Sequence, residues 1–149
     1  MKYGNETCIL PLVGTAFSMG KMMEAVERME NSEMQQIARA EAAYFMAQAD
    51  QCTHIVTPFL DSEDLCLRLS ADILYVFSNL TLGNAGAAQK GREDVERMMQ
   101  EVLKDHRCNT ESASCIFAYY VTTTFLHISP SEDIPDLKTA IPYLPEGQR

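Results

Sequence analysis

The apolar residues between positions 38 and 59 recur every three or four residues, and this spacing constrains the fold more than any other feature. The stripe consists of Ala38, Ala42, Phe45, Ala49, Cys52, Val56 and Phe59. Such spacing places these side chains on one face of an α-helix. Ser32 and Gln35 have the S-x-x-Q form of a capping box, which predicts that the helix begins at Ser32. Pro58 removes a backbone donor and disfavours helix at Thr57, where the helix is predicted to end.

The same spacing predicts a helix on either side of this one. Before it, apolar residues from Leu12 to Met29 step by three and four. After it, Asp61–Asp64 supplies a helix cap and acidic residues that suit the positive end of a helix. This third helix is expected to end at Gly83, because glycine readily adopts the left-handed conformation that stops a helix.

The second half of the chain contains an expected loop and two more predicted helices. Gly83–Gly91 is rich in glycine and alanine and is expected to be an exposed loop. An amphipathic helix follows at Arg92–Arg107, and Asn109–Ser112 breaks it. Cys115–Ile128 is rich in β-branched and aromatic residues, which favours a strand. We nevertheless predict a buried helix, because the segment is longer than a usual buried strand and no second strand is available to pair with it.

These elements predict an all-α fold. We expect a single-domain bundle of four to five helices with short hairpin turns, preceded by residues 1–11 as an N-terminal extension. Residues 129–149 contain four prolines. They are expected to form a tail that packs on the bundle, with one helical turn at Asp136–Ala140. A chain of 149 residues that is 46% apolar and 22% charged fits one globular domain.

The formal net charge of −9 at pH 7 bears on the class of partner. Nucleic acids and anionic membrane surfaces are bound by clustered Lys and Arg, so both are disfavoured as partners. No apolar run approaches the roughly 18–20 residues that span a bilayer. A basic protein partner is compatible with this charge, although an acidic balance also serves solubility.

Four of the five cysteines flank two predicted turns. Cys52 and Cys66 lie on either side of Pro58–Ser62, and Cys108 and Cys115 flank the break before the last predicted helix. Residues equally far from the turn of a helical hairpin lie side by side, so each pair could close a disulfide. The alternative is that all five are reduced, buried apolar groups. Reduced thiols would indicate the cytoplasm, and paired ones the periplasm or secretion with the leader absent from this chain.

The sequence contains no recognisable catalytic or metal-binding motif. There is no C-x-x-C, no H-E-x-x-H and no nucleotide-binding glycine loop. Cys52 with His54, and His106 with Cys108, are weak zinc candidates, because residues two apart on a helix face different directions. A Cys/His nucleophilic pair that assembles only in the fold stays open. We therefore expect no cofactor and no enzymatic activity.

This pattern favours a non-enzymatic protein-binding module of the inhibitor, immunity, adaptor or small-chaperone type. It would act through an acidic or Met-rich helical face on a protein partner; a basic partner and a homo-oligomer are both open. The candidate contact residues are Met22, Met29, Asp61, Glu63, Asp64, Asn84 and Gln89. The alternative is a helical bundle that binds an apolar small molecule or a metal among its methionine and aromatic side chains.

Overall fold

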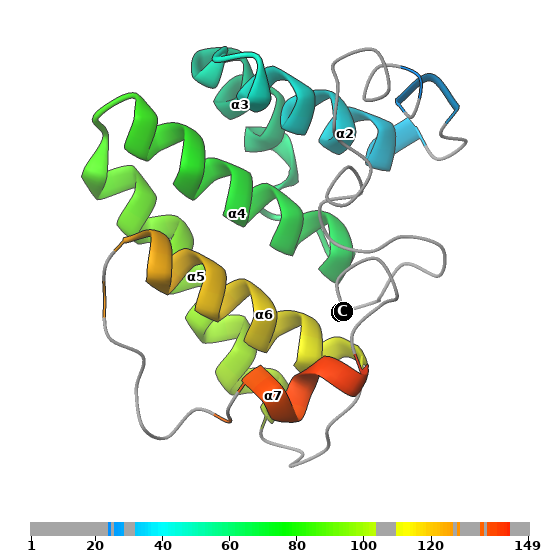
Figure 1. Cartoon of the computed structure of the whole chain (residues 1–149), viewed down its shortest axis with the longest axis vertical. Helices are drawn as coiled ribbons and strands as arrows, with labels where there is room; N and C mark the ends of the chain where they lie inside the picture. Colours follow the sequence, from blue (N-terminus) through cyan, green and yellow to red (C-terminus); the bar gives the residue numbers. More distant parts are fainter. Residues whose placement is uncertain are drawn as a thin grey trace.

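The fold is all-α in a computed structural model that describes residues 24, 26–28, 32–103, 110–126, 128, 135 and 137–143 (Figure 1). No β-strand occurs among these residues, which confirms the predicted fold class. The elements in chain order are α2 (Ser32–Phe45), α3 (Ala49–Val56), the 3-10 helix η1 (Thr57–Phe59), α4 (Leu65–Thr81), α5 (Ala85–Leu103), α6 (Thr110–Phe125), α7 (Leu137–Ala140) and the 3-10 helix η2 (Ile141–Tyr143).

Only fragments of the predicted helix at Leu12–Met29 are among the described residues. Residues 24 and 26–28 are helical, and Val26 is buried. The side-chain amide of Gln35 donates a hydrogen bond to the Val26 carbonyl at 2.9 Å, which ties this segment to α2. The N-terminal extension and most of the predicted tail lie outside the described residues.

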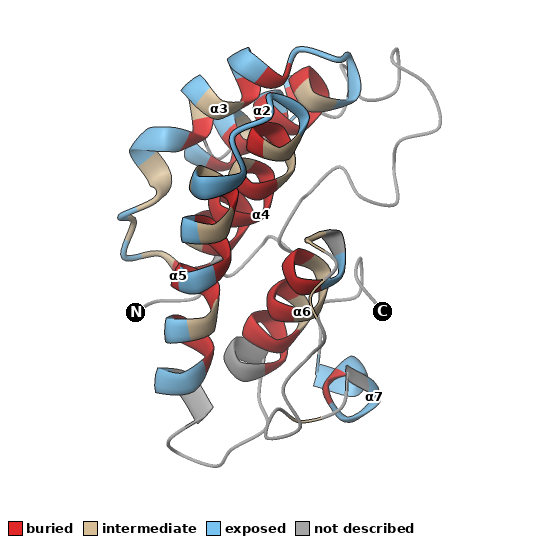
Figure 2. Cartoon of the chain, turned by 90° about the vertical axis from the view of Figure 1, so that its left-hand side faces the viewer, coloured by how far each residue is buried: buried red, intermediate tan, exposed pale blue. Residues whose placement is uncertain are grey.

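Helix α4 is the centre of the bundle. It contacts α2, α3, α5 and α6, and Figure 2 shows most of its length as buried. Its predicted cap is confirmed, because the Asp64 carboxylate accepts a hydrogen bond from the Leu67 backbone N–H at 3.3 Å. The Ser62 hydroxyl accepts a hydrogen bond from the Asp64 N–H at 3.1 Å. The turn before α4 lies where Pro58 predicted it, within and after η1.

The predicted single helix from Ser32 to Thr57 is wrong, because residues 46–48 divide it into α2 and α3. The N–H groups of Ala47 and Gln48 bond to the carbonyls of Tyr44 and Ala43, at 3.1 and 2.8 Å. This pair of bonds is a Schellman motif, which ends a helix with one left-handed residue. Ala47 is that residue, with a φ of 60°. An alanine seldom takes this conformation, so the apolar spacing gave no sign of the break.

The predicted exposed loop at Gly83–Gly91 is also wrong beyond its first two residues. Gly83 ends α4 as expected, with a φ of 81°, but α5 begins at Ala85. Gly91 lies inside α5 against α4, where an added Cβ would come within 2.9 Å of Val76 Cγ2. The glycine therefore permits two helices to approach closely, and it does not mark a loop.

Helix α6 confirms the helical interpretation of the segment after Cys115, although it starts earlier, at Thr110. The predicted break at Asn109–Ser112 is thus too long, and residues 104–109 lie outside the described residues. The Thr122 hydroxyl bonds back to the Ala118 carbonyl at 2.8 Å, which satisfies a buried polar group inside the helix. The Tyr120 hydroxyl donates to the Pro135 carbonyl at 3.0 Å and ties the start of the tail to α6.

Helix α7 lies where one helical turn was predicted. It packs on α6, and Ala140 at its end is fully buried. The core cluster contains buried residues from α2 to α7, which shows that the described helices share one hydrophobic core. Large apolar side chains that stay exposed outside this core are found at or near the ends of the helices.

Candidate functional site

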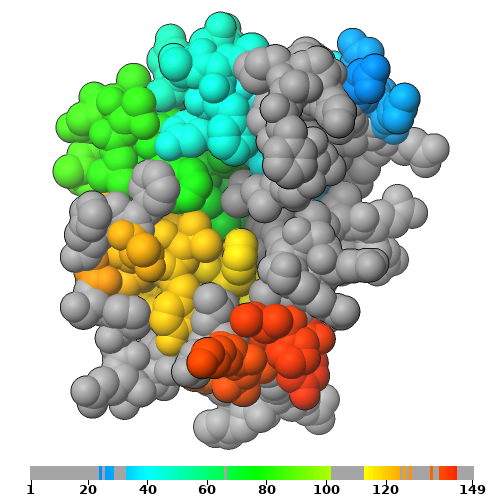
Figure 3. Space-filling view, viewed as in Figure 1, coloured from blue at the N-terminus to red at the C-terminus, as the bar shows by residue number. Residues whose placement is uncertain are grey.

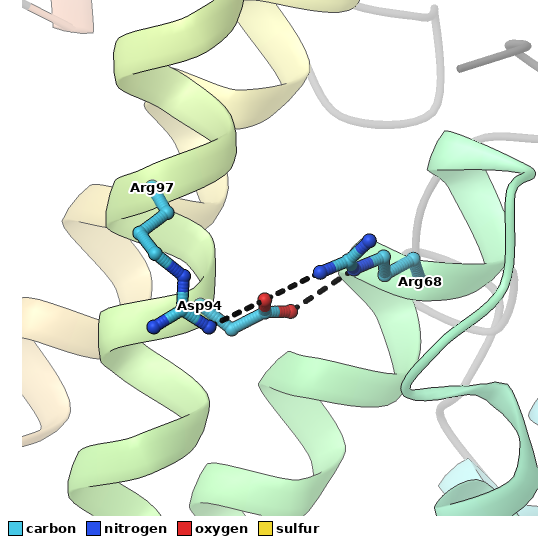
Figure 4. A network of polar contacts seen from close by, with 3 residues as sticks. All are labelled: Arg68, Asp94 and Arg97. Atoms are coloured by element: carbon cyan, nitrogen blue, oxygen red, sulfur yellow. Dashed lines mark hydrogen bonds and ion pairs between the residues drawn. The ribbon is translucent and has the colours of Figure 1, made fainter.

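A cluster of charged side chains joins the first half of α4 to the middle of α5 (Figure 4). Arg68 binds Asp94 with both nitrogens of its fork, with Nε 3.1 Å from Oδ2 and Nη2 2.5 Å from Oδ1. Arg97, one turn further along α5, also donates to Asp94 Oδ1 at 3.0 Å. Two-pronged pairing of this kind fixes the angle between the partners as well as their distance. The cluster thereby sets how α4 and α5 cross.

Asp72 is the buried member of the same cluster, one turn after Arg68 on α4. Burial raises the pKa of Asp72 to about 10, and a hydrogen bond to Asp94 with the negative charge of that residue adds to the effect. Burial alone would also raise the pKa of Asp94. The hydrogen bonds from Asp72, Arg68 and Arg97 outweigh it, so the pKa of Asp94 is lowered. The two carboxyl groups therefore hold one proton, on Asp72.

No sequence pattern had predicted this cluster. A signal was present, because Arg68 and Asp72 are four residues apart and sit beside the apolar stripe of α4. Charged residues four apart next to a buried stripe are typical of an ion-pair network between helices. What the sequence did not indicate was the partner, Asp94, which lies 26 residues beyond Arg68.

A second contact joins α5 to α6. The Arg92 guanidinium lies over the Tyr119 ring, 5.9 Å from its centre, and binds Glu96 at 3.3 Å. Tyr119 is fully buried, so this arginine covers one end of the core with its planar charged group. The Arg92–Tyr119 contact lies between α5 and α6, whereas the Arg92–Glu96 ion pair lies within α5.

Cys52 and Cys115 are buried thiols, so neither predicted disulfide is formed. Cys52 Sγ points at the Leu74 carbonyl, at 4.0 Å. Leu74 is eight residues beyond Cys66, or about 12 Å along α4. The two helices are thus offset, because the connection between them, which contains η1, runs from Thr57 to Asp64 and is longer than the predicted turn at Pro58–Ser62. The side chain of Cys66 and all of Cys8 and Cys108 lie outside the described residues.

The environment of Cys52 makes it unsuited to nucleophilic chemistry. Burial raises the pKa of its thiol to about 12, although a hydrogen bond with Ser78 acts in the opposite direction. The thiolate is the reactive form, so a thiol with this pKa is inert near neutral pH. His54, the nearest histidine in the sequence, is exposed.

The described part of the chain shows neither a metal-binding cluster nor a membrane-spanning helix. There, no group of three or more His, Cys, Asp or Glu side chains is placed to hold a metal ion. No helix in the described ranges is long and apolar enough to cross a membrane.

The predicted contact residues fall into two groups at opposite ends of α4, a helix of 17 residues that is about 25 Å long. Asp61 and Glu63 are exposed beside its start, whereas Asp64 is half-buried as the cap. Asn84 is exposed just beyond its other end, and Gln89 is half-buried in the second turn of α5. They do not form one surface. The remaining two candidates, Met22 and Met29, lie outside the described residues.

Large apolar side chains are exposed where α2 and α4 end. Phe45 is 53% exposed, Met46 39% and Leu82 44%. We call these three residues the apolar end. The rings of Tyr44 and Phe77 lie 5.7 Å apart, which places the last turn of α2 beside the last two turns of α4. In Figure 3 the cyan atoms of α2 and α3 adjoin the green atoms of α4 at the upper left.

The apolar end could not be found from apolar spacing alone. Phe45 belongs to the predicted stripe and was expected to be buried. Helix α2 instead ends at Phe45, and the Schellman turn at Ala47 follows two residues later, so Phe45 and Met46 lie at an exposed helix end. Among the predicted contact residues, only Asn84 is close in sequence to the apolar end, two residues after Leu82.

No family model, curated protein or solved structure matches this chain. Its function is therefore inferred from the chemistry and placement of its own residues.

Proposed function

We propose that this chain is a non-enzymatic protein-binding module whose contact surface is the apolar end of the bundle. The observation that carries the proposal is the exposure of Phe45, Met46 and Leu82 at the ends of two neighbouring helices. Large apolar side chains that gather on the surface of a globular protein mark sites where another molecule binds. Aromatic residues and methionine are also enriched in protein interfaces.

The use of the other reactive groups supports a binding role over catalysis. Arg68, Asp72 and Asp94 neutralise one another between α4 and α5 and bind the two helices together. The Cys52 thiol is buried and kept protonated. Asp64 and Ser62 form the hydrogen bonds of the helix cap. The acidic corner before α4 (Asp61–Asp64) therefore has fewer polar groups available to bind a partner. These groups serve the fold, whereas Phe45, Met46 and Leu82 stay largely exposed, with the Phe45 ring edge-on to Tyr44.

A comparison of surface variants tests this function. The tagged full-length chain would be used to capture proteins from an extract of its native cell. Replacing Phe45 and Leu82 together by serine should remove a stoichiometric partner that the unchanged chain retains. The matched control is the double replacement Ile141→Ser and Tyr143→Ser, because Tyr143 is 46% exposed and Ile141 39%, on η2 rather than at the apolar end.

The control should retain the partner, and circular dichroism should show both variants folded. The proposal is wrong if the unchanged chain retains no stoichiometric protein, or if the Phe45 and Leu82 variant retains it equally well.

A further inference from the structure

We infer that the turn between α2 and α3 is a hinge, at which α2 leaves its own bundle and packs in the same place on a second copy of the chain. In the resulting dimer, α2 and α3 of each copy form one continuous helix that bridges the two bundles. The inference is carried by the strain in this turn and by the apolar spacing that continues through it. It does not depend on the function proposed above.

The turn between α2 and α3 is short and strained. It spans residues 46–48, and Ala47 has a φ of 60° there. A Cβ atom makes this left-handed conformation unfavourable, so glycine or asparagine usually occupies such a position. The Gln48 side chain makes no capping hydrogen bond at the start of α3. The turn therefore lacks both the residue that would relax it and a side-chain cap for the second helix.

The residues of the turn suit a continuous helix. Met46, Ala47 and Gln48 are all good helix formers. A helix that ran straight through them would place Phe45 on the apolar stripe that continues from position 38 to position 59. In the folded single chain, Phe45 is instead 53% exposed at the break. Straightening the helix thus removes the strain at Ala47 and restores the stripe.

Exchange of α2 between two copies preserves the contacts that hold this helix. Helix α2 packs on α3 and α4, and the second copy offers the same two helices. Each copy therefore loses these contacts once and forms them once, which makes exchange a low-cost route to a dimer. The balance between the two forms is then set by the turn and by the protein concentration. Short hinges under strain shift that balance towards exchange.

Chromatography with light scattering measures the exchange. The full-length chain would be held in reductant at millimolar concentration, just below its unfolding midpoint, and then cooled and separated. We expect a dimer whose fraction rises with concentration. This dimer should return to single chains slowly after dilution, because α2 must leave one bundle before it enters the other.

Isotope mixing shows whether the dimer is an exchanged one. The Tyr44 ring lies beside Phe77 of α4, so a photoreactive Tyr44→benzoylphenylalanine variant should cross-link to α4. Dimers prepared from equal amounts of ordinary and heavy-isotope-labelled chains would be irradiated, and the cross-linked peptides analysed by mass spectrometry. In an exchanged dimer this cross-link joins two copies, so about half of the cross-links should combine the two labels. A dimer without exchange should give none that combine them.

Two glycine variants test the hinge itself. Ala47→Gly relaxes the turn and weakens the continuous helix, so it should favour the turn by about tenfold or more at each hinge. The dimer contains two hinges, and its dissociation constant should therefore rise about a hundredfold. The control Ala87→Gly lies inside α5, away from the turn, and should change that constant by less than about threefold.

Three outcomes contradict the inference. The first is that no dimer forms after this treatment. The second is a dimer in which every cross-link joins peptides of the same label. The third is a dimer whose dissociation constant Ala47→Gly leaves unchanged. Each of them overturns the exchange of α2, whereas the function proposed above is tested separately by its own capture experiment.

Discussion

At the scale of single residues, the contact between Asp72 and Asp94 makes one proton part of the folded structure. The unfolded chain releases the Asp72 proton above a pH of about 4. The folded chain keeps it up to a pKa of about 10. Between these values the folded state binds more protons, so this residue makes stability fall as pH rises. Asp94 acts in the opposite sense. Its lowered pKa contributes stability at neutral pH that is lost as pH falls through that lowered value.

Replacing Asp72 by Asn should therefore stabilise the protein at neutral and alkaline pH. The amide is neutral at every pH, whereas the buried carboxyl must bind a proton to be neutral. We expect a gain of at least about 1 kcal/mol at pH 8, which narrows towards pH 4. Urea unfolding at several pH values measures it. A gain that does not change with pH, or a loss of stability at pH 8, would contradict the shared proton.

The matched variant Asp94→Asn should have the opposite effect. It removes the negative partner of Arg68 and leaves that arginine partly buried without its ion pair. We expect a loss of about 2–3 kcal/mol at pH 7, below the full value of a buried pair because the Arg68 side chain is 24% exposed. The same unfolding series measures this loss, which should shrink in acid as Asp94 itself becomes protonated.

The buried thiols give a further prediction at this scale. In native protein, Cys52 should resist alkylation by iodoacetamide near neutral pH and react only after unfolding, because it is buried with a raised pKa. Mass spectrometry of peptides before and after denaturation measures this. Rapid alkylation of native Cys52, or recovery of a peptide that links it to Cys66, would contradict the position of its side chain against Leu74.

At the scale of helices and turns, the fold depends on two features that residue patterns convey poorly. Apolar spacing predicted most of the helical segments correctly, including α6, whose β-branched composition favoured a strand. It missed the break at Ala47, because the spacing continues through both α2 and α3 and no glycine marks the turn. The glycine and alanine content of Gly83–Gly91 wrongly placed Gly91 in a loop. The reason for that glycine is the close approach of Val76 on another helix, which no local pattern reports.

Replacing Ala47 by Gly should stabilise the protein by about 0.5–1 kcal/mol. Glycine adopts a positive φ without the steric cost that alanine bears at this position. The control is Ala87→Gly inside α5, which should lose about as much as Ala47→Gly gains. Thermal unfolding of the two variants measures both effects. Equal destabilisation by both would contradict the left-handed turn that separates α2 from α3.

Two glycines of α5 form a second matched pair. Gly91→Ala should cost about 1–3 kcal/mol, because the new methyl group would meet the stiff, branched side chain of Val76. Gly86 has nothing within 4 Å of an added Cβ, so Gly86→Ala should be neutral or stabilise by up to about 1 kcal/mol. Chemical unfolding of the two variants compares them. A Gly91→Ala variant as stable as the unchanged protein would show that α4 and α5 do not approach closely there.

At the scale of the whole molecule, a charged cluster joins α4 to α5, and the apolar end, which we propose as the binding surface, stays exposed. The predicted contact residues at Asp61–Asp64 and at Asn84 are separated by the length of α4. Of the two groups, only the one that contains Asn84 lies near the apolar end. The composition correctly indicated an acidic protein, but composition alone does not locate the charges. Residues 40–89 contain six acidic residues and one basic residue, Arg68. Nor could composition show that α2 and α4 end side by side, because that depends on the turn at Ala47 and the packing of Tyr44 on Phe77.

The most direct test of the central claim is differential hydrogen exchange of the full-length chain, measured with and without the captured partner. We expect slower exchange on binding in residues 43–51 and 79–87, which carry the ends of α2 and α4. Exchange in residues 137–143 should stay unchanged. Protection confined to the acidic corner at Asp61–Asp64, or protection that spares both helix ends, would contradict the assignment of the apolar end as the binding surface.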